Sequence, residues 1–156
     1  MDRKALAHTL ISAACGGFGI AAMLTLAALS GTPLGAIPFA TSIVLVAGAP
    51  RSPPARSKAV IFGHLICASA GIALHYSGFE GIATVAAVVA LSIALMLVFD
   101  VFHPPAGITP LVIYNSSLDW TFLFMPVLAG ALCVMLLART SERLQAMAGA
   151  GQGAQR

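Results

Sequence analysis

Long uncharged stretches run along this chain and are separated by single charges or short charged loops. Four of them, at about residues 5–29, 59–76, 80–100 and 120–138, are close to the length of about 20 apolar residues that a helix needs to cross a bilayer. The pattern therefore predicts an all-α integral membrane protein with four full transmembrane helices.

Two further apolar segments are shorter and contain prolines: one holds Pro38, and the other begins at Pro104 and Pro105. Each offers about 12 residues for a helix, which is about half the thickness of the hydrocarbon core at the rise of an α-helix. Proline fits the first helical turn, because its missing N–H would have no partner there. We expect short broken helices that start at Pro38 and Pro104, each joined to an extended stretch that completes the crossing.

The charges indicate whether these short segments cross. If both cross, all eight Lys and Arg residues share one side with the two termini, while Glu80 and Asp119 lie on the other. If neither crosses, Arg51, Arg56 and Lys58 lie opposite the termini. The positive-inside rule favours the first arrangement. It predicts a multi-pass protein of the bacterial inner (plasma) membrane with cytoplasmic N- and C-termini.

The order of a helix, a short Pro-led segment and a helix occurs twice. Since each unit crosses three times, the two units would be inverted repeats, as in many transporters. We place them at about 5–76 and 80–138, within a single transmembrane domain at 1–143. Residues 144–156 are rich in Gly, Ala and Gln and predict a flexible cytoplasmic tail.

Composition excludes several classes of protein. The chain is 59% hydrophobic and 8% charged, whereas soluble domains carry about 25% charged residues. Soluble enzymes, nucleic-acid binders and disordered chains are therefore excluded. The three cysteines all lie in apolar stretches, so we expect no disulfide framework.

The Pro-led segments also carry the candidate chemistry. Free N–H groups and the helix dipole attract anions to helix N-termini, and hydroxyl donors come from Thr41, Ser42 and Thr109. His103 precedes Pro104, where it could cap the helix, donate to an anion or shuttle a proton. His64 lies inside a predicted span, where it lines a path or forms an interhelical hydrogen bond.

The charged candidates lie near the loops. Asp100 is either a proton relay or a marker of the inner membrane surface, while Lys58 and Arg56 would draw anions to the inner mouth. The spacing of His64, Asp100 and His103 is not typical of metal ligands, so we expect neither a metal nor a cofactor. An intramembrane enzyme that uses Asp100 and His103, and a structural membrane subunit, stay as alternatives.

The stretch HPPAG at 103–107, followed by Thr109 and Leu111, resembles the signature of the HPP family of integral membrane proteins. Pro38-Phe39 with Ser42, and the later pair Gly63-His64, resemble other motifs of that family. The resemblance covers about residues 35–138. The chain departs from the family pattern in several places. Ala40 and Phe62 stand where the family has glycine, Lys58-Ala59 replaces Arg-Asn, and Ile108 and Pro110 replace small residues.

The family resembles nitrite transporters of cyanobacteria and chloroplasts. The resemblance therefore implies transport of nitrite, with nitrate and formate as other candidates, through a channel or secondary carrier and without enzymatic activity. A single chain of 156 residues would form only a thin wall around a pore, so we expect a homo-oligomer. The predicted pathway residues are Pro38, Thr41, Ser42, Lys58, His64, His103, Pro104, Pro105, Gly107 and Thr109.

Overall fold

The computed structural model describes residues 2–30, 37–116 and 120–150. Within these ranges the chain is helical and has no strand, which confirms the all-α expectation. Its six α-helices are α1 (Arg3–Ser30), α2 (Ile37–Gly48), α3 (Ser57–Ser77), α4 (Ile82–Val98), α5 (Thr109–Ser116) and α6 (Ala129–Ala150). Shorter turns are the 3₁₀ segments η2 (Pro53–Ala55) and η3 (Pro104–Ile108) and the π-helical segment η4 (Leu123–Leu128).

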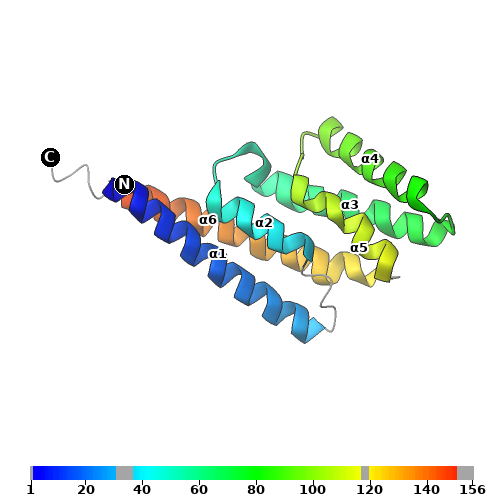
Figure 1. Ribbon diagram of the computed structural model, residues 1–156, viewed down its shortest axis with the longest axis horizontal. Helices are drawn as coiled ribbons and strands as arrows, with labels where there is room; N and C mark the ends of the chain where they lie inside the picture. Colours follow the sequence, from blue (N-terminus) through cyan, green and yellow to red (C-terminus); the bar gives the residue numbers. More distant parts are fainter. Residues whose placement is uncertain (1, 31–36, 117–119, 151–156) are drawn as a thin grey trace.

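The helices pack side by side in an elongated bundle (Figure 1). Helices α1, α2 and α6 contact one another, and α3 contacts α4, α5 and α6. Successive helices run in alternating directions along the long axis (Figure 1). The main apolar core joins α2, α3, α5 and α6 through fully buried side chains such as Phe39, Ile43, Val60, Ile72, Ile113 and Val134.

In the part of the chain that the structure describes, three stretches are long and apolar enough to cross a membrane: Arg3–Leu29, Ser57–Ser77 and Leu123–Ala148. Helix α4 has only 17 residues, fewer than the 21 predicted at 80–100. Residues with positive φ flank it, Gly81 at 99° and Asp100 at 52°. These turns shorten the helix to below the length of about 20 residues that a straight span needs.

The two Pro-led segments differ from each other. Helix α2 begins at Ile37, next to the predicted start at Pro38. In the second segment a helix also begins at the predicted Pro104, but its first turns are 3₁₀ and the α-helix begins only at Thr109. Pro105 supplies no N–H and disfavours the α conformation in the residue before it, whereas Pro110 fits the first turn of α5.

Helix α6 continues to Ala150, past the point where we predicted a flexible tail. The side chain of Gln145 faces inward: its Nε2 lies 3.1 Å from Ser12 Oγ and 3.4 Å from the carbonyl oxygen of Ala47. That carbonyl is in the last turn of α2, where it has no partner within the helix. The tail prediction is therefore wrong for residues 144–150, and residues 151–156 lie outside the described ranges.

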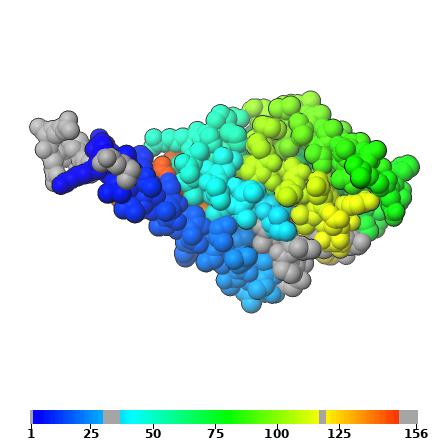
Figure 2. Space-filling model, in the orientation of Figure 1, coloured from blue at the N-terminus to red at the C-terminus, as the bar shows by residue number. Residues whose placement is uncertain are grey.

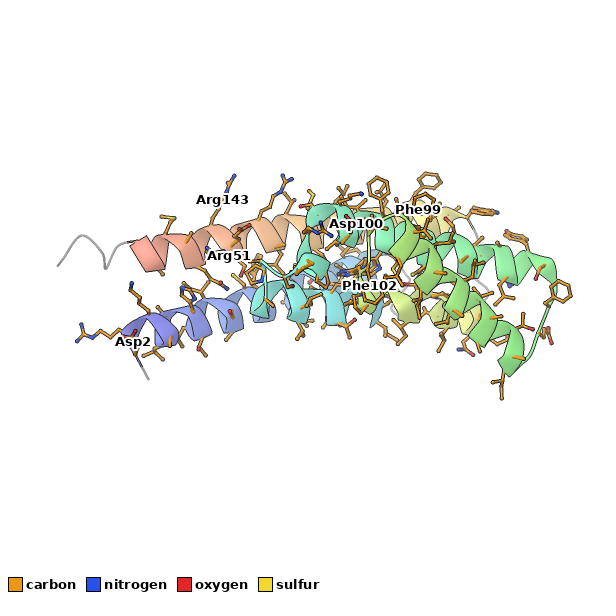
Figure 3. All side chains as sticks on the ribbon, turned by 90° about the horizontal axis from the view of Figure 1, so that it is seen from above. Asp2, Arg51, Phe99, Asp100, Phe102 and Arg143 are labelled. Carbon is orange, nitrogen blue, oxygen red and sulfur yellow. The ribbon has the colours of Figure 1, made fainter. Side chains whose placement is uncertain are left out.

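The two ends of the bundle differ in chemistry. The start of α1 and the end of α6 lie together at one end (Figure 1), and Asp2, Arg51 and Arg143 lie toward that end (Figure 3). The first turns of α1 project beyond α2 there (Figure 2), beside the last turns of α6 (Figure 3). Near the far end of α3, Tyr76 stacks on Trp120 with ring centroids 6.2 Å apart. Such an aromatic pair is typical of a membrane–water interface.

Candidate functional site

Three polar side chains meet in the interior of the bundle: Ser42 from α2, His64 from α3 and His103 from the connection between α4 and η3. All three are fully buried. Ser42 Oγ lies 2.9 Å from His64 Nε2 and 2.9 Å from His103 Nε2. The structure therefore joins three of the predicted pathway residues into one hydrogen-bonded cluster, which we call the His–Ser–His triad.

Backbone carbonyls of two neighbouring segments fix the orientation of the triad. His103 Nδ1 lies 2.7 Å from the carbonyl oxygen of Pro54 in η2. Ser42 Oγ lies 3.1 Å from the carbonyl oxygen of Pro38, which also accepts a hydrogen bond from Thr41 Oγ1 at 3.0 Å. The triad is thus held between the first turns of α2 and the loop that joins α2 to α3.

The partners of His103 assign its tautomer. A carbonyl oxygen can only accept, so Nδ1 of His103 carries a proton and donates it to Pro54. In a neutral ring Nε2 is then an acceptor. The single hydroxyl proton of Ser42 has two acceptors within reach, the carbonyl oxygen of Pro38 at 3.1 Å and Nε2 of His103 at 2.9 Å, and we assign it to the nearer one, Nε2. The oxygen of Ser42 can accept in turn from Nε2–H of His64. All the donors then point one way, from His64 through Ser42 to His103 and Pro54.

One atom of the triad, His64 Nδ1, is buried and has no hydrogen-bond partner among the described residues; the same is true of Thr109 Oγ1, at the start of α5. With its proton on Nε2, the free Nδ1 of His64 is an acceptor. Its ring packs against Phe39, with centroids 4.5 Å apart. Leaving a buried acceptor unpaired costs about 1–3 kcal/mol, and in native proteins such an atom commonly indicates a functional role or a bound water.

A glycine lets His103 approach α3. A Cβ atom on Gly63 would lie 2.8 Å from the Cβ of His103 and 3.3 Å from the carbonyl oxygen of Val101. Gly63 therefore allows the contact on which the triad depends. Phe62, by contrast, is 51% exposed and points away from this contact. The pair Gly63-His64 was visible in the sequence, but the need for a glycine was not.

Beside the triad is a shallow groove of about 400 Å³. Thr41, Leu45, Pro54, Pro104, Pro105 and Ile108 line it. It brings residues of the two Pro-led segments together. Two of its lining residues connect it to the triad: Pro54 accepts a hydrogen bond from His103, and Pro104 follows His103 in the chain. The predicted pathway residue Gly107 has open space where a Cβ would lie.

The N-terminus of η3 does not supply the free N–H donors that we predicted there. Pro104 and Pro105 have no N–H, and the N–H of Ala106 donates to the carbonyl oxygen of His103 at 3.0 Å. An anion at this segment would therefore depend on side-chain donors rather than on the backbone N–H groups of the first turn.

The charged candidates lie apart from the triad. Asp100 is exposed and pairs with Arg56 at 3.2 Å. This environment is typical of a residue at the membrane surface, and the ion pair is with Arg56 rather than with His103. Lys58 Nζ donates to the carbonyl oxygen of Phe99 at 3.1 Å, where a cation stabilises the C-terminal end of α4. Within the described parts of the chain, no group of three or more His, Cys, Asp or Glu side chains could hold a metal ion.

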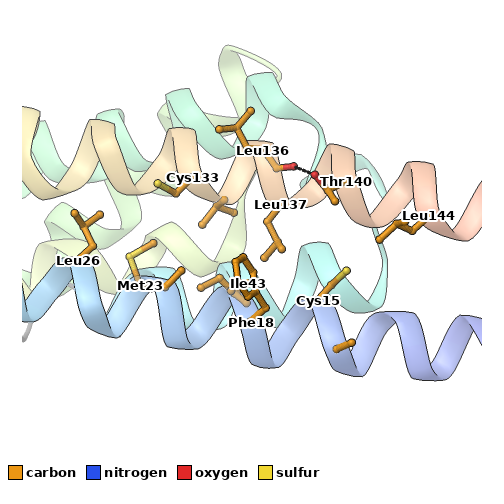
Figure 4. A pocket seen from close by; sticks show the side chains of 14 residues that line it. Cys15, Phe18, Met23, Leu26, Ile43, Cys133, Leu136, Leu137, Thr140 and Leu144 are labelled. Carbon is orange, nitrogen blue, oxygen red and sulfur yellow. Dashed lines mark hydrogen bonds between the residues drawn. The ribbon is translucent and has the colours of Figure 1, made fainter.

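A larger groove of about 560 Å³ lies between α1 and α6 (Figure 4). Its walls are apolar, among them Phe18, Met23 and Leu137. The hydroxyl of Thr140 in its lining donates to the carbonyl oxygen of Leu136 in the same helix. This groove fits hydrocarbon and lacks the hydrogen-bond donors that an anion needs, so we place the candidate site at the triad.

The fold and the triad define a multi-helix membrane protein with a polar centre between two Pro-interrupted segments. A family model described as HPP, transmembrane region, matches residues 1–149. The chain therefore belongs to the HPP family of transmembrane proteins, as its motifs indicated.

Two transmembrane proteins of Dictyostelium discoideum are similar to this chain, at 37% and 34% identity over 108 residues in each case. These matches cover 64% of this chain but only 38% and 35% of the two relatives. This chain thus corresponds to less than half the length of the relatives it matches. No solved structure matches it.

Proposed function

We propose that this protein carries a small monovalent anion across the membrane, with nitrite as the first candidate and nitrate and formate as the next. The observation that carries the proposal is the fully buried His–Ser–His triad beside two Pro-interrupted segments. Polar residues at membrane depth commonly mark a substrate or ion pathway. Irregular backbone at that depth is tolerated where it is buried in protein or lines a cavity.

The chemistry around the triad favours an anion over a cation. Among the described residues, no carboxylate is hydrogen-bonded to the three side chains, and Asp100 pairs with Arg56 instead. The imidazole N–H and hydroxyl donors of the triad are engaged with one another and with Pro54. An anion in the adjoining groove would therefore gain its donors when the triad takes up a proton, or when Thr41 turns its hydroxyl from the carbonyl oxygen of Pro38 toward the groove. Arg51 and Arg143 lie toward the end where α1 begins and α6 ends (Figure 3). Basic residues there would raise the local concentration of anions.

A hydrolytic enzyme is the second candidate, because Ser42 Oγ and His103 Nε2 are separated by 2.9 Å, the spacing of a nucleophile and its base. Transport is the better proposal, since both side chains are fully buried and the hydroxyl of Ser42 is also hydrogen-bonded to His64. A fluorophosphonate probe distinguishes the two: covalent labelling of Ser42 would favour the enzyme, and its absence transport.

Nitrite uptake into proteoliposomes tests the proposal. We expect uptake with the wild-type protein, competition by nitrate and loss of most uptake with His103→Ala. His75→Ala is the matched control, because His75 lies in the last turn of α3, outside the triad. Gel filtration establishes that each variant is folded, and also reports the homo-oligomer that we propose. No uptake of nitrite, nitrate or formate by the folded wild-type protein would contradict the proposal.

A further inference from the structure

We infer that the His–Ser–His triad is a proton-transfer chain, so that each anion crosses together with a proton. This inference rests on the proposed anion transport and adds the coupling ion to it. Its basis is the single direction of donors through the triad, together with the unpaired Nδ1 of His64 at the open end. That atom is a buried acceptor at the end of a hydrogen-bonded chain, where a proton can enter.

The transfer moves one proton and no electrons. A protonated water gives its proton to Nδ1 of His64 and is left as neutral water. The Nε2–H bond of His64 breaks as its proton passes to Ser42 Oγ. The original O–H bond of Ser42 breaks as its proton passes to Nε2 of His103. His64 and Ser42 end neutral, and His103 ends as an imidazolium.

The charged ring of His103 has an acceptor for both of its N–H groups. Nδ1–H donates to the carbonyl oxygen of Pro54 at 2.7 Å, and Nε2–H donates to Ser42 Oγ at 2.9 Å. The hydroxyl of Ser42 then turns to Nε2 of His64, or to the carbonyl oxygen of Pro38 at 3.1 Å. Each step therefore replaces one hydrogen bond by another, and the positive charge comes to rest beside the groove, opposite an anion bound there.

Few other titratable groups lie around the triad. Helix α2 and η3 contribute none. Besides His64, α3 contributes Cys67, whose Sγ faces the Sδ of Met96 at 3.9 Å, and Lys58, which bonds to Phe99. The neighbouring charges are paired with each other, Arg56 with Asp100 and Arg51 with Glu142 of α6. In the described residues, the two histidines of the triad are therefore the groups placed to carry a proton with the anion.

Nitrite uptake into proteoliposomes with and without an inward proton gradient tests the inference, with uptake into protein-free vesicles subtracted. We expect the gradient to raise wild-type uptake several-fold, and a pH dye inside the vesicles to report entry of protons with nitrite. Ser42→Ala removes the central hydroxyl and should abolish the response to the gradient. Ser92→Ala is the matched control: it removes another buried hydroxyl, which donates to Val88 within α4, and should keep the response.

The outcomes separate the two proposals. Uptake by the wild type without any response to the gradient overturns the proton chain and leaves anion transport standing. Absence of uptake with folded protein overturns both. A second measurement does not depend on variants: nitrogen NMR of histidine-labelled protein should show the neutral tautomers Nδ1–H at His103 and Nε2–H at His64. The opposite tautomer at either ring overturns the chain.

Discussion

Gly63 lies so close to His103 that a Cβ atom on Gly63 would be only 2.8 Å from the Cβ of His103. The prediction is that Gly63→Ala pushes His103 away from Ser42 and Pro54, because the second neighbour of this Cβ position, the carbonyl oxygen of Val101 at 3.3 Å, is backbone and cannot move aside as a side chain can. We expect a loss of about 1–3 kcal/mol in the free energy of unfolding, as is usual for overpacking, together with loss of nitrite uptake. Thermal unfolding in detergent and uptake into proteoliposomes measure the two effects.

The control for this variant is Gly17→Ala in α1, where a Cβ would meet nothing within 4 Å. Alanine is favoured over glycine inside a helix by about 0.5–1 kcal/mol, so the control should be as stable as the wild type or more so. Equal stability and uptake in Gly63→Ala and Gly17→Ala would show that the close approach does not matter.

The helical class and the long apolar helices could be predicted from the sequence, because they follow from run lengths and prolines. Uncharged runs gave the long helices, and Pro38 indicated the start of α2 to within one residue. The histidines stood out as candidates because they are polar residues in apolar surroundings. These signals are local, and each can be read from a short window of the chain.

The contacts within the site could not be predicted, because they join residues far apart in the chain. Ser42 was one of three hydroxyl candidates. Only the packing of α2 on η3, with the hydrogen bond from Ser42 to His64 of α3, shows that it bridges the two rings. The helical end of the chain was missed for a similar reason. From the sequence alone Gln145 is typical of a polar tail, and only the structure shows its contact with Ala47 of α2.

Asp100 provides a second prediction: Asp100→Asn should leave nitrite uptake nearly unchanged. Its carboxylate pairs with Arg56, and the two side chains are 74% and 53% exposed, so the pair contributes at most about 1 kcal/mol. Asparagine also tolerates the positive φ of this position. Uptake and thermal unfolding of the variant check this expectation. A large loss of uptake in folded protein would instead make Asp100 part of the proton path.

The direction of the helices gives a third prediction, on topology. If both Pro-led segments cross, Asp2→Cys and Ser52→Cys should react with a membrane-impermeant maleimide from one side, and Glu80→Cys from the other. The background replaces Cys15, Cys67 and Cys133 with alanine and must retain uptake. Labelling of Ser52→Cys and Asp2→Cys from opposite sides would overturn the arrangement of two inverted repeats.

A fourth prediction concerns the end of α6. A chain that stops after Arg143 should be less stable than one that stops after Ala150, because it lacks Gln145. The carbonyl oxygen of Ala47 then keeps the hydroxyl of Ser141 as a donor but loses the amide of Gln145. Loss of these buried hydrogen bonds should cost about 1–3 kcal/mol. Gln145→Ala should reproduce most of that loss in the full chain, whereas Met147→Ala, at a side chain that is 69% exposed, should have little effect. Thermal unfolding in detergent ranks the four proteins, and equal stability of the two shortened chains would mean that the contact between α6 and α2 does not hold this end of the helix in place.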